Sequence, residues 1–214
     1  MTSTTGDSMK CARRSMPGRS QCVRDRMMKL FQFVASFIAL LGIVSAAQSA
    51  DAPKPNPPPG GWSGVHAFDF EVGSWSVHHR VQRATGIWFE FEGTCTTRLL
   101  ISGAGNVEEH VFNKPEGTAT GVGLRAFDPK SALWAIWWMD GRDPHGALDP
   151  PVKGRFEDGI GTFYAEGILN GKRIRTRYTW SKITATSAHW EQANSSDEGK
   201  TWQTNWYMDF TRIS

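Results

Sequence analysis

Residues 161–180 of the chain read GTFYAEGILNGKRIRTRYTW and carry the clearest signal of fold class. Two runs with alternating, β-branched and aromatic residues, 161–169 and 172–180, flank Asn170-Gly171. An Asn-Gly pair between two such runs is typical of a tight β-hairpin turn. Asp158-Gly159 repeats the signal one hairpin earlier. The stretch therefore predicts consecutive antiparallel strands.

Similar runs continue along the chain, separated by Gly, Asp-Pro and Asp-Gly turn signals. They predict ten strands, at residues 74–82, 86–98, 105–113, 119–127, 132–139, 152–157, 161–169, 172–180, 187–194 and 201–212. No stretch after residue 62 has apolar residues at helical spacing over the length of a helix. Because the turns are short, neighbouring strands are expected to pair antiparallel.

A sheet of ten strands must protect its edges, which either barrel closure or a two-sheet sandwich achieves. Several of the predicted strands are about ten residues long, and this favours the barrel because tilted barrel strands are long. We therefore predict an all-β fold, a single antiparallel up-and-down barrel of about ten strands. An eight-stranded barrel already has room for a small ligand, so a wider one is expected to contain a cavity.

The two ends of the predicted barrel carry a recognisable pair of motifs. Gly73-Ser74-Trp75 opens the first strand, and the last strand ends in Phe210-Thr211-Arg212. This pairing resembles the lipocalin-like (calycin) barrels, in which Gly-x-Trp lies at the closed end and a basic residue of the final strand covers the indole. The resemblance implies that Trp75 and Arg212 are structural residues, joined by a cation–π contact.

The chain also resembles an exported bacterial family of unknown function with a lipocalin-like barrel, distantly similar to nitrobindin and fatty-acid-binding proteins. The resemblance rests on Phe68 to Trp75, on Phe127-Asp128-Pro129 followed by Trp134, and on Asp197 to Trp202. It covers nearly all of residues 68–212. It implies a fold and says almost nothing about activity, since function depends on the site and not on the fold.

The N-terminal region has the composition of an export signal. Lys29 precedes an apolar run at 30–44, and small residues follow up to Ala50. These are the parts of a secretory signal peptide, with an uncleaved membrane anchor as the alternative. We predict an N-terminal extension and signal peptide at 1–50, a Pro-rich linker or arm at 51–67 and the barrel domain at 68–214. The mature protein is expected to be periplasmic or secreted, with no membrane association after cleavage.

Charge and motif content exclude several classes of function. From Asp51 onward the chain has 17 basic and 19 acidic residues, which argues against a nucleic-acid partner because phosphate binding needs concentrated positive charge. Cys95 is the only cysteine after residue 50 and has no internal disulfide partner. The sequence lacks a phosphate-binding glycine loop, a paired zinc motif and a Gly-x-Ser-x-Gly turn. No metal or cofactor is predicted.

Strand alternation indicates two residues that line the lumen. If Trp75 points into the barrel, His79 does too, because every second residue of a strand shares a face. Tyr178 lies on the face opposite a row of arginines at 173, 175 and 177, which is expected to face solvent. We therefore predict that His79 and Tyr178 contact a ligand.

The chain is rich in tryptophan, with ten indoles. Most are expected to pack within the barrel or pair across hairpins. In the run 133–139, Trp137 lies on one face and Trp134 and Trp138 lie on the other, and both faces are apolar. We predict that Trp137 lines the lumen. Trp134 and Trp138 are then expected to form an outer face that contacts a lid, the arm or a partner, including a second copy of the chain in a homodimer.

Two charged residues are candidate polar anchors for the ligand. Arg125 lies near Gly121 and Gly123, which leave space beside the wall, and an interior arginine would require a carboxylate or a ligand. A surface position is the alternative. Glu191 shares a face with His189, and the sequence does not determine whether that face is the inner one.

The leading hypothesis is an exported protein that binds a small apolar or aromatic molecule in the lumen. The alternative is a cofactor-free lyase, isomerase or hydratase in which His79 pairs with Glu191 or Tyr178 as acid and base. Haem or nitric-oxide binding, with His189 or His79 as the axial ligand, is a lower-ranked hypothesis that follows from the nitrobindin resemblance.

Overall fold

The computed structural model describes residues 61–169 and 171–214. They form an all-β domain with three short 3₁₀ helices, η2 (Gly64–His66), η3 (Asp69–Glu71) and η4 (Ile101–Gly103). The strands are β1 (Gly73–Ala84), β2 (Ile87–Leu100), β3 (Gly105–Lys114), β4 (Gly117–Asp128), β5 (Leu133–Asp140), β6 (Val152–Glu157), β7 (Ile160–Leu169), β8 (Lys172–Ser181), β9 (Ser187–Ser195) and β10 (Gln203–Arg212). All ten lie close to their predicted positions.

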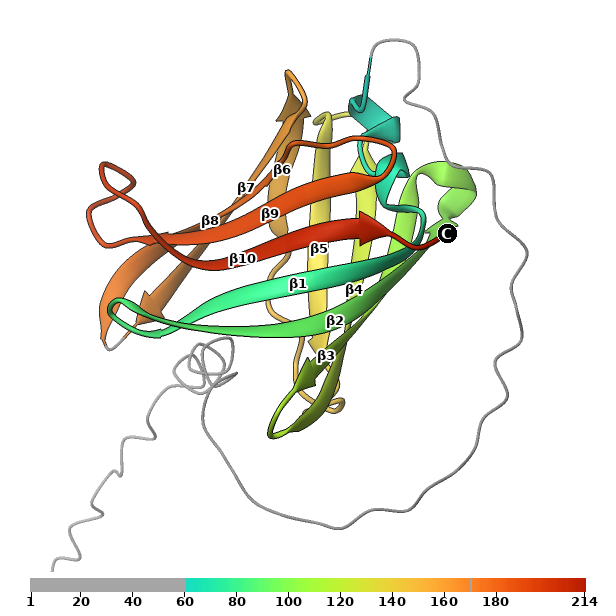
Figure 1. Ribbon diagram of the computed structural model, residues 1–214. Coiled ribbons are helices and arrows are strands. Elements are labelled where there is room, and N and C mark those ends of the chain that lie inside the picture. The colour runs from blue at the N-terminus through green and yellow to red at the C-terminus, as the bar shows by residue number, and fades with distance from the viewer. Residues whose placement is uncertain (1–60, 170) are drawn as a thin grey trace, which may run out of the picture.

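The ten strands form a closed barrel in sequence order, with β10 paired to β1. Every neighbouring pair is antiparallel, and the closing pair aligns Trp75 with Arg212 and Val81 with Trp206. In Figure 1, β1, β2, β9 and β10 form the wall nearest the viewer and cross the direction of β4, β5 and β6 behind them. The predicted fold class, a single up-and-down barrel, is confirmed.

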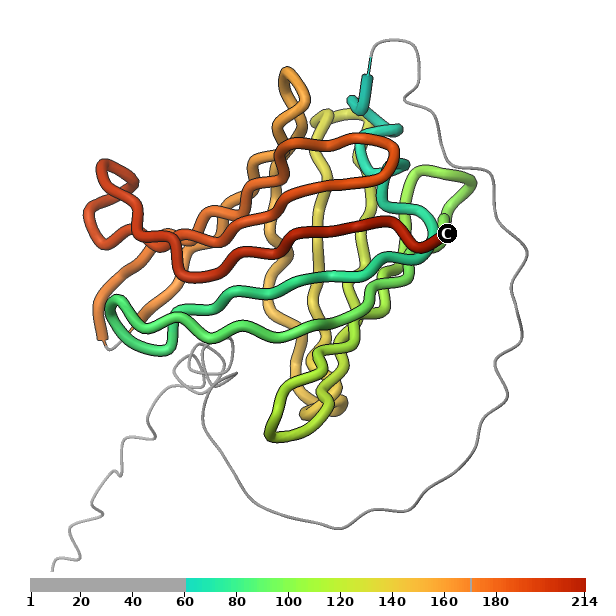
Figure 2. Tube along the Cα trace, viewed as in Figure 1, coloured from blue at the N-terminus to red at the C-terminus, as the bar shows by residue number. Residues whose placement is uncertain are grey.

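The two ends of the barrel differ in construction. One end, which we call the closed end, holds the short helices and the C-terminus (Figure 2). The other end holds the tips of the β1–β2 and β3–β4 hairpins and the β5–β6 connection, and we call it the mouth. Ser214 accepts a hydrogen bond from the Ser74 backbone N–H (3.0 Å), which fixes the C-terminus at the closed end.

An aromatic plug fills the closed end. Phe68 and Phe70, on either side of the start of η3, are fully buried. Their rings meet those of Trp134, Phe156, Phe163 and Trp180 at centroid distances of 5.0–6.2 Å. Trp62 and Ala67, in the segment predicted to be a linker or arm, are also buried in this core. Burial of so many large rings gives the barrel one hydrophobic core in place of a disulfide.

The Gly-x-Trp motif and the final arginine meet as the calycin resemblance implied. The Arg212 guanidinium carbon lies 4.1 Å from the centroid of the Trp75 ring. Arg212 also donates hydrogen bonds to the carbonyls of Val72 (2.6 Å), Phe70 and Ala185 (2.7 Å). A Cβ on Gly73 would lie 2.6 Å from the guanidinium, and its φ of +113° favours glycine. The motif therefore locks the first and last strands together.

The two faces of β5 are the reverse of the prediction. Trp134 is buried in the plug and donates its indole N–H to the Gly64 carbonyl at 2.8 Å. Trp138 packs with Phe112 inside the barrel. Strand alternation then places Trp137 on the outer face. The prediction of an outer Trp134 and Trp138 face for a partner is wrong, because both rings point inward, Trp134 into the plug and Trp138 toward Phe112.

The predicted signal peptide and residues 51–60 of the predicted arm lie outside the described residues. Within 61–169 and 171–214, no helix has the length and apolar character needed to cross a membrane.

Candidate ligand site in the barrel interior

The half of the interior nearer the mouth is not fully packed. Six inward-facing aliphatic and aromatic residues there are only half-buried: Ile136, Trp138, Val152, Tyr178, Trp190 and Trp206. By contrast, inward-facing residues at the closed end, such as Phe163 and Trp180, are at most 2% exposed. A side chain that points into a closed barrel meets solvent only where the interior is open. The apolar interior therefore remains accessible toward the mouth.

Four of these half-buried rings and the buried ring of Phe112 form a continuous surface, which we call the aromatic wall: Phe112, Trp138, Tyr178, Trp190 and Trp206. Trp190 lies 5.8 Å from Tyr178 and 5.8 Å from Trp206, measured between ring centroids. Phe112 lies 6.1 Å from both Trp206 and Trp138. The wall spans strands β3, β5, β8, β9 and β10, so barrel closure is what assembles it.

Tyr178 presents an unused polar group on this wall. Its hydroxyl is buried, and among the described residues it has no hydrogen-bond partner. Burial, followed by the charge of Asp149, raises the pKa of the phenol well above its usual range, so the hydroxyl is neutral and able to donate or accept. A buried hydroxyl without a partner costs about 1–3 kcal/mol. A ligand atom that reached the hydroxyl through a small movement of the neighbouring side chains would remove that cost.

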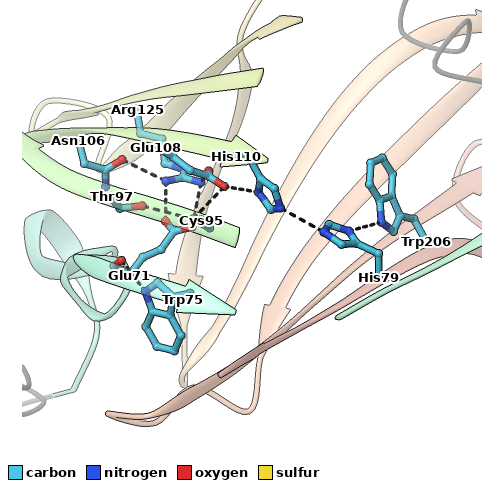
Figure 3. A network of polar contacts seen from close by, with 10 residues as sticks. All are labelled: Glu71, Trp75, His79, Cys95, Thr97, Asn106, Glu108, His110, Arg125 and Trp206. Atoms are coloured by element: carbon cyan, nitrogen blue, oxygen red, sulfur yellow. Dashed lines mark hydrogen bonds and ion pairs between the residues drawn. The ribbon is translucent and has the colours of Figure 1, made fainter. Parts of the chain in front are cut away.

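A chain of hydrogen bonds crosses the interior behind the wall (Figure 3). It runs from Trp206 Nε1 to His79 Nδ1 (3.3 Å), from His79 Nε2 to His110 Nε2 (3.2 Å) and from His110 Nδ1 to Glu108 Oε1 (2.9 Å). An indole nitrogen is only a donor, so His79 Nδ1 must accept. A neutral His79 then donates from Nε2, and a neutral His110 donates from Nδ1 to the Glu108 carboxylate. One tautomer of each ring satisfies every contact.

His79 is held neutral by its surroundings. It is fully buried, and burial followed by the adjacent His110 lowers the pKa of His79 to about 2. Gly93 makes the room for this ring, because a Cβ there would lie 2.8 Å from His79 Nε2. Strand alternation placed His79 inside correctly. Both of its ring nitrogens, however, already form hydrogen bonds, with Trp206 and His110. The ring is therefore held in one orientation and has no nitrogen left for a ligand.

Arg125 forms the charged centre of the network in Figure 3. It is buried and donates to both oxygens of Glu71 (2.5 and 3.2 Å), to Glu108 and to Asn106 Oδ1 (3.1 Å). A Cβ on Gly123 would lie 3.0 Å from Glu108 Oε2, so this glycine leaves space for the pair. The interior position of Arg125 is confirmed, and carboxylates supply the compensation that such a position requires.

The surroundings shift the pKa values of the two glutamates around Arg125 in opposite directions. Burial raises the pKa of Glu71 to about 8, because the opposing attraction of Arg125 does not fully offset desolvation. Burial would also raise the pKa of Glu108, but Arg125 and the hydrogen bond from His110 lower it to about 2. The surroundings therefore favour the ionised form of Glu108 and the protonated form of Glu71 beside the arginine.

A potential metal-binding group, Cys95, Glu108 and His110, has ligand atoms within 4.8 Å of one another. Its chemistry fits a metal poorly. The Glu108 carboxylate already accepts from Arg125, whose positive charge opposes a cation. Burial, followed by the charge of Glu108, raises the pKa of the Cys95 thiol well above its usual range, whereas metal ligation needs the thiolate. These residues form a structural polar network.

The other predicted site residues lie on the outside of the barrel. Glu191 faces Arg177 at 3.7 Å, and its register partners are Thr179 and Tyr207. The predicted acid and base pair of His79 with Glu191 is therefore wrong, because the two side chains lie on opposite faces of the wall. His189 is also on the outer face, with its Nδ1 2.6 Å from Asp209. Neither histidine offers the interior nitrogen that an axial haem ligand requires.

Sequence reasoning missed several interior residues that the barrel brings together. Glu108, His110 and Phe112 follow one another at every second position of β3, so alternation contained the signal for a shared inner face. Trp190 lies on the face opposite Glu191, but the sequence does not determine which face is inner, and it assigns no face to Trp206. Glu71 precedes the first strand, where no periodic pattern applies. Of the five predicted ligand residues, the barrel places His79, Arg125 and Tyr178 inside.

Comparison with known proteins supports the fold alone. No protein-family model matches the sequence, and no curated protein matches it. Among solved structures, the S-type phycobiliprotein lyase CPES from Guillardia theta is similar, with a TM-score of 0.50, 10% identity, and coverage of 71% of this chain and 93% of that chain. Rv2717c from M. tuberculosis has a TM-score of 0.46, 11% identity, and coverage of 75% and 100%. The chain has a calycin, or lipocalin-like, barrel fold.

Proposed function

We propose that this protein binds a small, flat, largely apolar molecule inside the barrel, between the mouth and the aromatic plug. The observation that carries the proposal is the Tyr178 hydroxyl, buried without a partner on a wall of half-buried aromatic rings. Ligand pockets are typically apolar with a few placed polar groups. The aromatic wall and Tyr178 have this composition.

The physical properties of the wall define the ligand. Indole and phenol rings bind planar groups through stacked or edge contacts, each worth about 0.5–1.5 kcal/mol beyond the area that is buried. Tyr178 would form one hydrogen bond with a donor or an acceptor on the ligand. We therefore expect a planar ring system with a polar atom on its edge.

Binding is favoured over catalysis by the state of the interior histidine. General acid and base catalysis needs a titratable group within hydrogen-bond reach of the substrate. His79 already uses both of its nitrogens, and its pKa lies far from neutrality. One structural neighbour is a phycobiliprotein lyase, but at 10% identity this likeness supports the architecture and not the reaction. A lyase, isomerase or hydratase activity remains the alternative proposal.

The proposed function includes export from the cytoplasm. The apolar run at 30–44 between Lys29 and the small residues up to Ala50 supports a signal peptide. We propose that the barrel acts in the periplasm or outside the cell, as a carrier for its ligand.

Tryptophan emission tests the binding proposal. The neutral probe N-phenyl-1-naphthylamine is expected to bind saturably at micromolar concentration and to quench tryptophan emission by energy transfer. Trp190→Phe replaces an indole of the wall with a smaller ring and removes one emitter, and it is expected to reduce both the affinity and the quenched fraction. Trp202→Phe is the matched control, because Trp202 packs outside the barrel under Arg177. Absence of saturable quenching in the unaltered protein would refute the proposal.

A further inference from the structure

A β-bulge in β10 brings two consecutive side chains to the barrel interior. The register with β9 shifts between Thr204 and Trp206, which pair with Ala193 and Gln192, so Asn205 is the extra residue. Trp206 faces inward, and strand alternation alone would point Asn205 outward. Gln192, the inward-facing partner of Trp206, nevertheless donates from Nε2 to Asn205 Oδ1 at 3.0 Å. The bulge therefore turns Asn205 toward the interior, and bulges beside active sites commonly re-aim a side chain in this way.

The amide pair of Gln192 and Asn205 borders the end of the aromatic wall that lies away from the plug. Along the inner face of β8 the residues run from Trp180, in the plug, to Tyr178 and then to Thr176. Tyr178 is the register partner of Gln192. Gln192 and Asn205 are half-buried, so the pair meets the open part of the interior. The Tyr178 hydroxyl and the two amides therefore lie where the inner surface changes from apolar to polar.

The hydrogen bond between the two amides leaves a complementary pair of atoms unused. A carboxamide has one acceptor oxygen and two donor hydrogens. Among the described residues, Gln192 Oε1 and Asn205 Nδ2 have no hydrogen-bond partner. Because the amides are joined at 3.0 Å, this acceptor and this donor lie within the reach of one small group. Rotation of both amides by half a turn exchanges their roles and again leaves one acceptor and one donor.

The polar groups on the inner faces of β8 and β9 near the amide pair are neutral. They are the hydroxyls of Tyr178 and Thr176 and the amide of Asn194, which accepts from Thr176 Oγ1 at 2.9 Å. The charge of Asp149, in the β5–β6 connection, also acts on Tyr178 and disfavours an anion there. An ion that left water for this site would lose its hydration without gaining an opposite charge on these strands. The inner surface therefore favours a neutral ligand that carries a donor beside an acceptor.

We propose that the ligand presents a cis-amide edge to this pair, the –NH–CO– group of a flat lactam or imide ring whose apolar body lies on the aromatic wall. The ligand N–H donates to Gln192 Oε1, and the ligand carbonyl accepts from Asn205 Nδ2. This inference rests on the proposed function and adds the chemical class of the ligand. A ring without the N–H leaves the Gln192 oxygen unpaired and binds more weakly.

Two probes with the same fused rings test this proposal. 2-Quinolinone carries the cis-amide edge, and 2-methoxyquinoline lacks the N–H. By calorimetric titration we expect the unaltered protein to bind 2-quinolinone about tenfold more tightly than the ether. Asn205→Leu is expected to remove most of this difference and to leave the affinity for N-phenyl-1-naphthylamine within about twofold. Asn113→Leu, at an exposed position of β3, is the matched control and is expected to change none of these affinities.

Each outcome has a distinct meaning. Retained binding of N-phenyl-1-naphthylamine by Asn205→Leu shows that the variant is folded and its wall intact. If that binding is lost, Gln192→Met, which keeps the bulge residue, replaces Asn205→Leu in the same comparison. The amide site is refuted, while the binding function stands, if the unaltered protein does not prefer 2-quinolinone or if the variant keeps the preference. If no probe binds the unaltered protein, the proposed function is refuted and the amide site falls with it.

Discussion

Trp206 donates its indole N–H to Nδ1 of His79 across 3.3 Å, and this one contact sets the direction of a hydrogen-bond chain that ends at a buried carboxylate. Because an indole nitrogen cannot accept a hydrogen bond, His79 Nδ1 must accept, and this fixes which atom donates in each of the later hydrogen bonds. Trp206 also belongs to the aromatic wall, where its ring meets Trp190. The same side chain therefore lines the proposed ligand site and orders the polar network behind it.

The tautomer of His79 is the first prediction. At neutral pH His79 is expected to carry its proton on Nε2, which the ¹⁵N shifts of the imidazole ring report directly. Trp206→Phe leaves Nδ1 without a donor in an apolar setting and is expected to lower the free energy of unfolding by about 1–3 kcal/mol. Detection of a proton on His79 Nδ1 in the unaltered protein would contradict the proposed chain.

Stability is expected to depend on pH through Glu71. The folded pKa is about 8, against an ordinary value of 4.5. Between these values the unfolded chain releases the proton while the folded protein keeps it, so the Glu71 contribution falls as pH rises. The slope is at most about 1.4 kcal/mol per pH unit. The unfolded form of His79, with an ordinary pKa of 6.5, is half protonated at pH 6.5 and largely neutral above about pH 7.25. Its opposing contribution is therefore smaller than that of Glu71 across this window.

Glu71→Gln tests this dependence with a neutral side chain of the same shape. Urea unfolding at pH 6.5, 7.25 and 8 should show a loss of stability in the unaltered protein and little change in Glu71→Gln. Glu109→Gln, at an exposed position of β3, is the control and should keep the slope of the unaltered protein. The same slope in all three proteins would rule out a protonated Glu71.

Removal of Arg125 is expected to be among the most damaging single changes. Arg125→Met leaves Glu108 ionised and buried without its partner, at a cost of about 3–5 kcal/mol in unfolding free energy. The double variant Arg125→Met with Glu108→Gln removes that charge and is expected to regain part of the loss. Arg155→Met is the matched control, since Arg155 pairs with Glu157 at the surface and is expected to cost less than about 1 kcal/mol. Equal losses in the two single variants would contradict the buried network.

The Tyr178→Phe variant tests whether the Tyr178 hydroxyl contributes to ligand binding or to the stability of the fold. Its hydroxyl has no partner among the described residues, so its removal is expected to keep or raise the free energy of unfolding, by up to about 1 kcal/mol. Affinity for N-phenyl-1-naphthylamine, whose amine is the polar atom available to Tyr178, is expected to fall about fivefold. Tyr164→Phe, on the exposed side of β7, should alter neither quantity. A clear loss of stability in Tyr178→Phe would mean that the hydroxyl has a structural partner.

Periodicity predicted the barrel and part of its interior. Alternation from Trp75 placed His79 inside correctly, since β1 is regular from Trp75 to Val81. The glycines near Arg125 correctly indicated space for a buried side chain. In both cases a feature within one strand, the alternation of β1 or the glycines of β4, indicates which side chains point inward. The sequence alone was therefore enough to predict these two positions.

Periodicity failed where both faces of a strand are apolar, or where both mix polar and apolar residues. The run 133–139 offers no polar side to orient β5, and the plug from η3 decides which indoles are covered. In β9, the face with Glu191 and the face with Gln192 each mix polar and apolar residues, and closure against β10 makes the first one outer. Glu71 lies 54 residues before Arg125, so only the assembled barrel shows that the two meet.

A crystal structure of the protein grown with N-phenyl-1-naphthylamine would decide whether the barrel interior is a binding site. We expect the naphthalene ring between Trp190, Trp206 and Trp138, with the amine of the probe within hydrogen-bond distance of the Tyr178 hydroxyl. A probe found only on the outer face, or an interior filled by protein side chains with no room for the ring, would contradict this account.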